Sequence, residues 1–435
     1  MNENDVSVVP CDNYDDELVE SALRDVLEPI RGLDFVRPGM TVAIKVNLVS
    51  AMKPDSAATV HPSVVCALTR LLRERGAQVV IGDSPGGLYT AAYLKVVYDV
   101  CGMRKAEAFG ARLNDDFSTT QITFPEAAKA KQFPYTAWLQ KADAVIDLCK
   151  LKTHGMMGLT CAVKNFFGVI PGTQKPEFHY RFPRAEDFAD MLVDLYEYVA
   201  PKLCICDAVI GMEGNGPTQG MPRKIGCLLA GTNGHQLDAV AAGLIGMTVQ
   251  DIPTLRAAAA RGLLEPDGLH KKPKEISEAE RLSTAVEAPI PPQKHPSRES
   301  AVISAPGTGA KPTTFSCGVP GLRIFGDPTR FAIPDFKTVQ AQSSVFFMIL
   351  GDGIPGKIAD FFASRLLTPF PKLVSSACVG CAKCANVCPA KAITMVDQKP
   401  KINRKTCIHC FCCQEFCPKG AMQVGRHAVM KLLGK

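Results

Sequence analysis

The C-terminal part of the chain contains one cysteine pattern twice, and this duplication constrains the fold more than any other feature. The spacing C-x-x-C-x-x-C-x-x-x-C-P begins at Cys378 and returns 29 residues later at Cys407. Three closely spaced thiolates can bind three corners of one 4Fe–4S cubane, whereas the fourth lies too far along the chain and ligates the other cluster. The pattern therefore predicts two clusters, one held by Cys378, Cys381, Cys384 and Cys417 and the other by Cys407, Cys410, Cys413 and Cys388.

Zinc and disulfides are the alternative uses of cysteines this dense. Zinc sites favour paired C-x-x-C units rather than triplets with a trailing Cys-Pro. Disulfides among eight cysteines this close together would be strained in several pairings. Both alternatives are weaker than the cluster interpretation. Cys412 lies between two predicted ligands but outside the repeat, and we expect it to be a packed thiol.

The chain from Ser375 onward resembles the bacterial two-cluster ferredoxin module, and the resemblance implies a pseudo-twofold unit that passes single electrons. Residues 375–435 contain ten Lys or Arg but only two acids, Asp397 and Glu415. Soluble ferredoxins of this type are usually acidic. A basic module suits an acidic electron donor, such as a free ferredoxin or flavodoxin, although solubility would explain the charge equally well.

The whole chain has the length and composition of an ordinary protein of two or three domains. It has 435 residues, of which 46% are hydrophobic, and its net charge of +6 is too small and too dispersed to indicate nucleic-acid binding. The acidic start does not resemble a secretory signal, and no segment approaches the roughly 20 apolar residues of a membrane span. Unpaired cysteines and oxygen-sensitive clusters favour a reducing cytoplasm, in an anaerobe.

Before residue 266, predicted strands and helices alternate. A strand from Thr41, a helix over 61–77 and a strand from Gln78 form a βαβ unit, after a first helix over 15–31. Further short strands are predicted at 143–149 and 203–211, and helices at 186–199 and 234–246. The pattern predicts an α/β body with a mainly parallel sheet and ligands at the carboxyl ends of its strands. Neither a Walker motif nor G-x-G-x-x-G is present.

Composition divides the rest of the chain into three parts. After the α/β domain at 1–265, residues 266–312 are rich in proline and serine, and we interpret them as a linker or lid. Residues 313–374 are apolar but irregular, and are predicted to dock the C-terminal module onto the α/β domain. Residues 375–435 form the predicted 2×[4Fe–4S] module, a small ferredoxin-like α+β unit.

Polar side chains follow the predicted strands, and in a parallel sheet they would converge on one crevice. Lysines together with Asn and Ser donors make a pocket for carboxylate or phosphate groups. A single lysine is usually a solvated surface charge, so the prediction rests on lysines that recur after several predicted strands. The predicted substrate- or anion-binding residues are Lys45, Asn47, Asp83, Ser84, Lys150, Lys164, Asn165 and Asn215.

The predicted catalytic residues are His154, Glu213 and Lys152. Histidine is the best proton donor by type, because its ordinary pKa of about 6.5 allows either role near neutrality. Asp83, Glu213 and Asp238 could instead bind a divalent cation. Asp238 could equally offset the dipole of a helix in whose first turn we expect it.

These segments also resemble the family known as domain of unknown function 362, over about residues 40–247. The matching motifs include IKVNLVS, IGDSPGG, KLKTHGMMGLTCAVKNFFGVIPG and CDAVIGMEGNGPTQGMPRK. The resemblance implies an α/β domain in an iron–sulfur protein, since the ferredoxin pair is a common companion, but it implies no substrate. The domain is distantly similar to the N-terminal part of nickel-pincer lactate racemases, with no residue-level basis for carrying over that cofactor.

Three functions are compatible with these features. We favour a reductase that passes single electrons from the clusters to a small anionic substrate or bound cofactor in the lysine-rich crevice. The alternatives are an electron-transfer or maturation partner without substrate chemistry, and a redox-sensing metabolite binder. An organic cofactor such as a flavin stays open, because flavins often bind without a fingerprint motif.

Overall fold

The structure is a computed structural model that describes residues 5–265, 317, 319, 322–339 and 369–425. The predicted linker or lid at 266–312 lies entirely outside the described residues. Of the predicted docking segment, only 317, 319, 322–339 and 369–374 are described.

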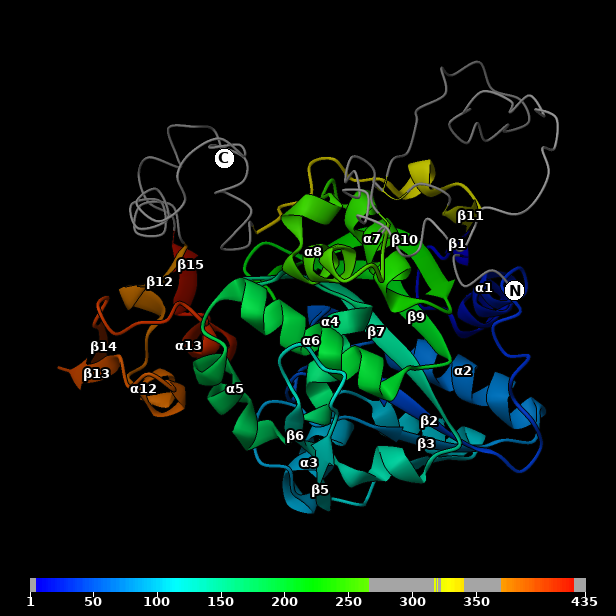
Figure 1. The fold of residues 1–435 in the computed structure, drawn as a ribbon, viewed down its shortest axis with the longest axis horizontal. Helices are drawn as coiled ribbons and strands as arrows, with labels where there is room; N and C mark the ends of the chain where they lie inside the picture. Colours follow the sequence, from blue (N-terminus) through cyan, green and yellow to red (C-terminus); the bar gives the residue numbers. More distant parts are fainter. Residues whose placement is uncertain (1–4, 266–316, 318, 320–321, 340–368, 426–435) are drawn as a thin grey trace, which may run out of the picture.

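Within the described residues, nine strands form one mixed sheet at the centre of the body (Figure 1). Its order is β11-β1-β10-β9-β7-β2-β3-β4, and β8 pairs with β7. The five strands from β9 to β4 are mutually parallel, whereas β10 runs antiparallel to both β9 and β1. The prediction of an α/β body with a mainly parallel sheet is confirmed. The strands are β1 (Asp5–Pro10), β2 (Thr41–Val46), β3 (Gln78–Gly82), β4 (Ala111–Leu113), β7 (Ala144–His154), β8 (Gly158–Thr160), β9 (Leu203–Glu213), β10 (Met221–Gly231) and β11 (Arg323–Phe325).

Helices cover both faces of this sheet, because each has one apolar stripe to bury. One face packs against α1 (Asp16–Leu27), α2 (Pro62–Glu74) and α3 (Ala91–Val100). The other face packs against α4 (Ala162–Asn165), α6 (Ala185–Val199), α7 (Gly234–Leu244) and α8 (Pro253–Ala260). The short helix α5 (Lys175–Arg181) and a hairpin of β5 (Thr119–Thr123) and β6 (Gln132–Thr136) complete the body. Short 3₁₀ turns lie at Pro54–Ser56, Met103–Phe109, Ala137–Lys141, Phe166–Val169, Gly172–Gln174, Val249–Asp251, Pro328–Phe331 and Ser375–Ala377.

Strand β7 is longer than the sequence predicts. We expected a strand at 143–149 that leads into a loop with three cationic or titratable residues. Instead the strand continues to His154, because its last part pairs with β8 on one side and with β9 on the other. Lys150 and Lys152 are therefore strand residues and are buried. Strand β9 likewise extends to Glu213, because it stays paired with β10 up to Met221.

The C-terminal module is an internal duplication. Strand β12 (Phe370–Leu373), helix α12 (Lys383–Val387) and strand β13 (Ile393–Val396) recur 29 residues later as β14 (Lys399–Ile402), α13 (Cys412–Glu415) and β15 (Met422–Gly425). The two halves exchange strands, since β12 pairs with β15 and β13 pairs with β14, both antiparallel. This confirms the predicted ferredoxin-like α+β module. Its first strand begins at Phe370, inside the segment that we predicted to be a docking segment.

The backbone of the two halves repeats in detail. Three positions with positive φ in the first half have positive-φ counterparts 29 residues later, and the pairs are Gly380 with His409, Ala382 with Phe411, and Lys391 with Gly420. Residues with a Cβ seldom adopt this conformation, which costs roughly 1 kcal/mol or more. The same local coil is therefore built twice, around each cysteine triplet, largely without glycine.

Part of the segment before the module belongs to the body. Strand β11 adds to the sheet edge beside β1 in parallel register. Arg223 of β10 forms an ion pair with Asp335 at 2.8 Å. None of the described helices is both long and apolar enough to span a membrane.

Candidate functional site

The four cysteines predicted for the first cluster line one cavity. Cys378, Cys381, Cys384 and Cys417 surround it, and Leu373, Met395 and Met422 contribute apolar walls. Three of these cysteines come from one coil of the first half and the fourth comes from the second half. This is the crossed arrangement that the spacing predicts, so the residues present fit a 4Fe–4S cluster.

The other four cysteines also gather around one another. Burial raises the pKa of the Cys413 thiol, and the neighbouring thiols of Cys410, Cys407 and Cys388 raise it further. The amide N–H of Ala392 donates to Cys388 Sγ at 3.2 Å, a contact that tunes cluster potential in such proteins. This donor set fits a second cluster. The extra thiol, Cys412, is buried and lowers the pKa of Cys410 through a hydrogen bond.

In the body, Lys45 and Asp83 form a buried ion pair at the carboxyl ends of β2 and β3. Lys45 Nζ lies 2.7 Å from Asp83 Oδ1, and the two side chains are 0% and 4% exposed. The same ammonium donates to the carbonyl oxygens of Val46 and Asn165 at 2.9 and 3.1 Å. Asp83 Oδ2 accepts from the amide of Leu48 at 2.9 Å. Both groups therefore have internal partners.

Amide side chains connect this pair to Lys152 of β7. Asn165 Oδ1 accepts from Lys45 Nζ at 3.2 Å and from Asn47 Nδ2 at 3.0 Å. Lys152 Nζ in turn donates to Asn47 Oδ1 at 2.7 Å and to the carbonyl of Ala58 at 2.6 Å. Among the described residues, no carboxylate pairs with Lys152. Burial lowers the pKa of Lys152 to about 7, and the charge of Lys164 acts in the same direction.

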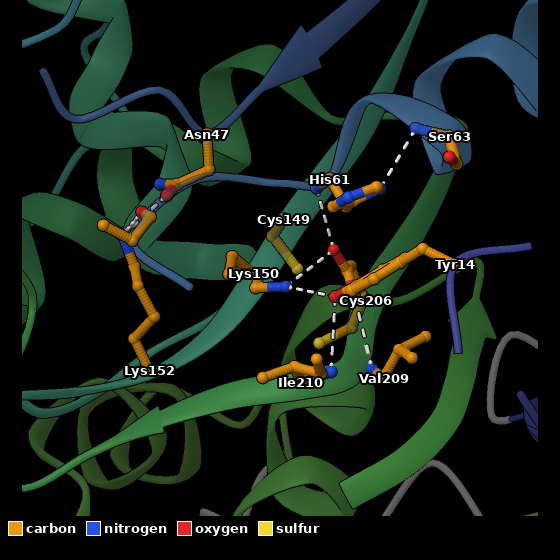
Figure 2. Close-up of polar contacts among 12 residues, drawn as sticks. Tyr14, Asn47, His61, Ser63, Cys149, Lys150, Lys152, Cys206, Val209 and Ile210 are labelled. Atoms are coloured by element: carbon orange, nitrogen blue, oxygen red, sulfur yellow. Dashed lines mark hydrogen bonds and ion pairs between the residues drawn. The ribbon is translucent and has the colours of Figure 1, made fainter. Parts of the chain in front are cut away.

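Lys150 belongs to a separate group on the α1 and α2 face of the sheet (Figure 2). Its Nζ lies 2.8 Å from Asp207 Oδ2 and donates to the hydroxyl of Tyr14 at 2.7 Å. The Tyr14 hydroxyl donates to Asp207 Oδ1 at 2.8 Å, and its ring stacks on His61 at 3.6 Å. Figure 2 shows Lys150 pointing toward this group and Lys152 pointing toward Asn47. The predicted single crevice is thus divided into two networks.

His154, at the end of β7, is held as a neutral ring. Its Nδ1 accepts from the amides of Met156 and Met157, both at 3.1 Å, so Nε2 carries the hydrogen. Burial lowers the pKa of His154 well below its ordinary value. Nε2 is buried and has no hydrogen-bond partner among the described residues. The geometry supports a role as hydrogen-bond donor rather than as imidazolium.

The three carboxylates considered for a divalent cation do not meet. Asp83 pairs with Lys45, whereas Glu213 accepts from the amide of Lys337 at 3.1 Å. Asp238 accepts from the amides of Ala162 and Val163 at 2.7 and 3.1 Å and so caps α4. It lies beyond the first turn of α7, which begins at Gly234, so the expected dipole role is wrong. Burial raises the pKa of Asp238 to about 7.

The remaining predicted residues lie near the module. The Asn215 side-chain oxygen accepts from the amide of Val424 at 3.2 Å, and its carbonyl accepts from Gln414 at 2.8 Å. Lys164 forms no hydrogen bond or ion pair with another described residue. Burial lowers the pKa of Lys164, whereas the nearby Glu415 of the module acts to raise it. The Ser84 hydroxyl is buried and also lacks a described partner.

Sequence reasoning missed several buried or half-buried polar residues. Lys175 donates to the carbonyls of Ser84 and Ile170 at 2.6 and 2.5 Å, and burial lowers its pKa to about 7. Asp147 accepts from Asn165 at 2.6 Å and is fully buried. Its position inside the apolar run DAVIDLC was a signal that could have identified it. Tyr14 and His61 gave no such signal, since they meet Asp207 only in the fold.

The module packs directly on the end of β7. A Cβ on Gly155 would lie 3.1 Å from Val424 and 3.2 Å from the ring of Phe411. A Cβ on Gly86 would lie 2.8 Å from the ring of Phe416. Phe411 and Phe416 lie between predicted cluster ligands in the sequence. The glycines therefore allow the cluster loops to approach the polar networks closely.

A cleft of about 460 Å³ opens beside this contact, between α5 and the module. Thr173 and Tyr180 line it from the body. Asn386, Lys391 and the predicted ligand Cys388 line it from the module. A small molecule in this cleft would lie next to a residue of the second cysteine set.

Comparison with known proteins agrees with this two-part organisation. The profile of a domain of unknown function (DUF362) matches residues 42–243, and that of a 4Fe–4S dicluster domain matches residues 370–418. A thylakoid-associated protein of Synechocystis sp. is 33% identical over 266 residues, which cover 59% of this chain and 79% of that protein.

Two solved structures are more distant. The lactate racemase apoprotein of Thermoanaerobacterium thermosaccharolyticum has 10% identity and a TM-score of 0.34, over 55% of this chain and 57% of that one. A Thermotoga maritima protein has 14% identity and a TM-score of 0.34, over 53% and 58%. This chain spans less than two thirds of either, and neither likeness bears on its chemistry.

Proposed function

We propose that this chain, which belongs to the DUF362 family and carries a 4Fe–4S dicluster domain, is a reductase of a small anionic molecule. The observation that supports it most is the contact between the cluster loops and the end of β7. Phe411, between two predicted ligands of the second cluster, lies against Gly155, the residue after His154. When bound, the two clusters supply electrons one at a time.

Lys152 and Lys164 are the residues that we assign to the anion. Neither has a carboxylate partner among the described residues, and burial lowers the pKa of both. The Lys152 ammonium is buried without a counter-charge, which is unfavourable, so an entering anion gains a charge-assisted contact that water does not offer. Lys164 is half-buried and close enough for its charge to act on Lys152. Lys45 and Lys150 serve the fold instead, since each already pairs with an aspartate.

Lys152 also suits the proton transfer that accompanies a reduction. An amine with a pKa of about 7 can both donate and recover a proton near neutrality. His154 would donate a hydrogen bond from Nε2, which has no other described partner. Glu213 is held by the segment at Lys337 and is left out of the proposed reaction.

The test uses anaerobic holoprotein, photoreduced and mixed with a panel of small carboxylates, phosphates and oxyanions. The return of oxidised-cluster absorbance measures electron transfer. For an accepted substrate, Lys152→Met and Lys164→Met should each slow turnover about 10- to 100-fold, because a hydrogen bond to a charged group contributes about 1.5–3 kcal/mol. Lys95→Met, at an exposed position on α3, is the matched control. Equal rates in all variants would contradict the assignment.

A second candidate is an electron carrier without substrate chemistry. It is favoured by the internal pairing of Lys45 and Lys150, which leaves few cations for a ligand. A carrier would reduce a protein acceptor equally well in the Lys152 and Lys164 variants. A ligand whose affinity depends on cluster oxidation state, without product, would instead indicate a redox sensor.

We propose an acidic electron donor, such as a ferredoxin or flavodoxin, because Lys401 and Lys405 are exposed on the module. We also propose a cytoplasmic location, where cysteines stay reduced. Cell fractionation tests this. Recovery with membranes would contradict it and would match the thylakoid association of the Synechocystis relative.

A further inference from the structure

Three cysteines of the body, far in sequence from the cluster ligands, bring their sulfur atoms together. The Sγ atoms of Cys149, Cys161 and Cys206 all lie within 4.8 Å of one another. Cys149 and Cys161 are 3.6 Å apart, and Cys161 Sγ lies 3.4 Å from Cys206 Sγ. All three residues are at most 1% exposed. We call this group the thiol triad.

The fold fixes each member of the triad. Cys149 and Cys206 are register partners on the adjacent parallel strands β7 and β9, so both point to the same face. Cys161 immediately precedes α4, and the Asp238 carboxylate anchors the first two amides of that helix. The third sulfur is thereby held above the strand pair. Cysteines that only fill a protein core would not need to bring three sulfur atoms together.

We propose that the thiol triad binds one soft monovalent metal ion, of which copper(I) is the first-row example. Thiolate sulfur selects soft ions, whereas hard cations prefer oxygen. Metal–sulfur bonds of about 2.3 Å would place three sulfurs about 4 Å apart around a trigonal ion, close to the observed separations. The sulfurs are too close together to surround a cubane.

Coordination number favours a monovalent ion over zinc. Structural zinc almost always takes four ligands. Among the described residues, no fourth His, Cys, Asp or Glu joins this group. Because the triad is closed, the ion would enter during folding.

The experiment compares holoprotein purified anaerobically from cells grown with and without added copper. Metal analysis after exposure to a copper(I) chelator should find about one copper per chain in the wild type, with the iron content unchanged. Cys161→Ser should retain at most a tenth of this copper. Cys227→Ser, which alters another buried thiol of the same body, should retain it fully.

X-ray absorption at the copper edge should show three sulfur neighbours at about 2.3 Å. The proposal is overturned if the wild type retains no copper, or if Cys161→Ser retains as much as wild type. It is also overturned if copper binds only when iron is lost, because the cluster cysteines would then be its ligands. Equal far-ultraviolet circular dichroism of the two variants would show that both are folded.

Discussion

The Lys45–Asp83 pair offers a direct way to separate a structural role from a ligand-binding one. The two groups lie 2.7 Å apart and are almost fully buried. Asp83→Asn keeps the shape of the side chain but leaves the Lys45 ammonium without its counter-charge. Breaking one side of a buried pair costs about 3–5 kcal/mol. At about 2–4 °C per kcal/mol for a domain of this size, the melting temperature should fall by roughly 6–20 °C.

The assay is an anaerobic thermal scan of the holoprotein by circular dichroism at one fixed heating rate. Asp115→Asn is the matched control, since it breaks the exposed pair of Arg112 and Asp115, whose side chains are 61% and 76% exposed. Exposed pairs contribute about 0–1 kcal/mol. A difference of about 3 °C in melting temperature corresponds to about 1 kcal/mol. If Asp83→Asn melts within about 3 °C of this control, the pair does not stabilise the body. Asp83 would then be available for a ligand.

Three further predictions concern the clusters, the proton donor and the partner surface. Iron analysis should show that the double variant Cys378→Ser/Cys417→Ser loses about four irons, no more than either single variant. The double variant Cys378→Ser/Cys388→Ser should lose both clusters. Equal iron losses in the two double variants would refute the crossed assignment. Because burial lowers the Lys152 pKa to about 7 from 10.5, the folded state binds fewer protons than the unfolded state between these values. Wild-type stability should therefore rise from pH 7 to pH 9 relative to Lys152→Met, by about 2 kcal/mol if the amine is fully protonated when unfolded, as thermal scans at the two pH values would show. Reversing Lys401 and Lys405 to Glu should slow reduction by an acidic ferredoxin about tenfold at low salt, measured by stopped flow, with the difference shrinking as salt is added; an unchanged rate would place the donor elsewhere.

The module could be predicted from sequence because its determinants are local. The spacing from Cys378 to Cys388 dictates a tight coil, and its return at Cys407 dictates a second one. The structure repeats the strands, the helices and three positive-φ positions at the same interval. The parallel sheet could be predicted equally well, since strand and helix patterns alternate with short connections.

The polar networks could not be predicted, because their members are distant in sequence. Lys150 looked like a loop residue after an apolar run, and only Asp207 and Tyr14 make its burial tolerable. The thiol triad is likewise formed by register between β7 and β9, which no sequence interval encodes. In both cases a side chain was interpreted from its neighbours in the chain, whereas its environment is set by the sheet.

The arrangement of the two parts makes cluster assembly and the proposed site interdependent. Phe411 and Phe416 belong to the same coils that hold the second cysteine set and also pack against Gly155 and Gly86. Loss of iron would release these coils, because the positive φ of Phe411 is tolerable only in a fixed loop. The contact at Gly155, three residues after Lys152, would then be lost. In the proposed reductase, anion binding would therefore require that the clusters that supply the electrons are in place.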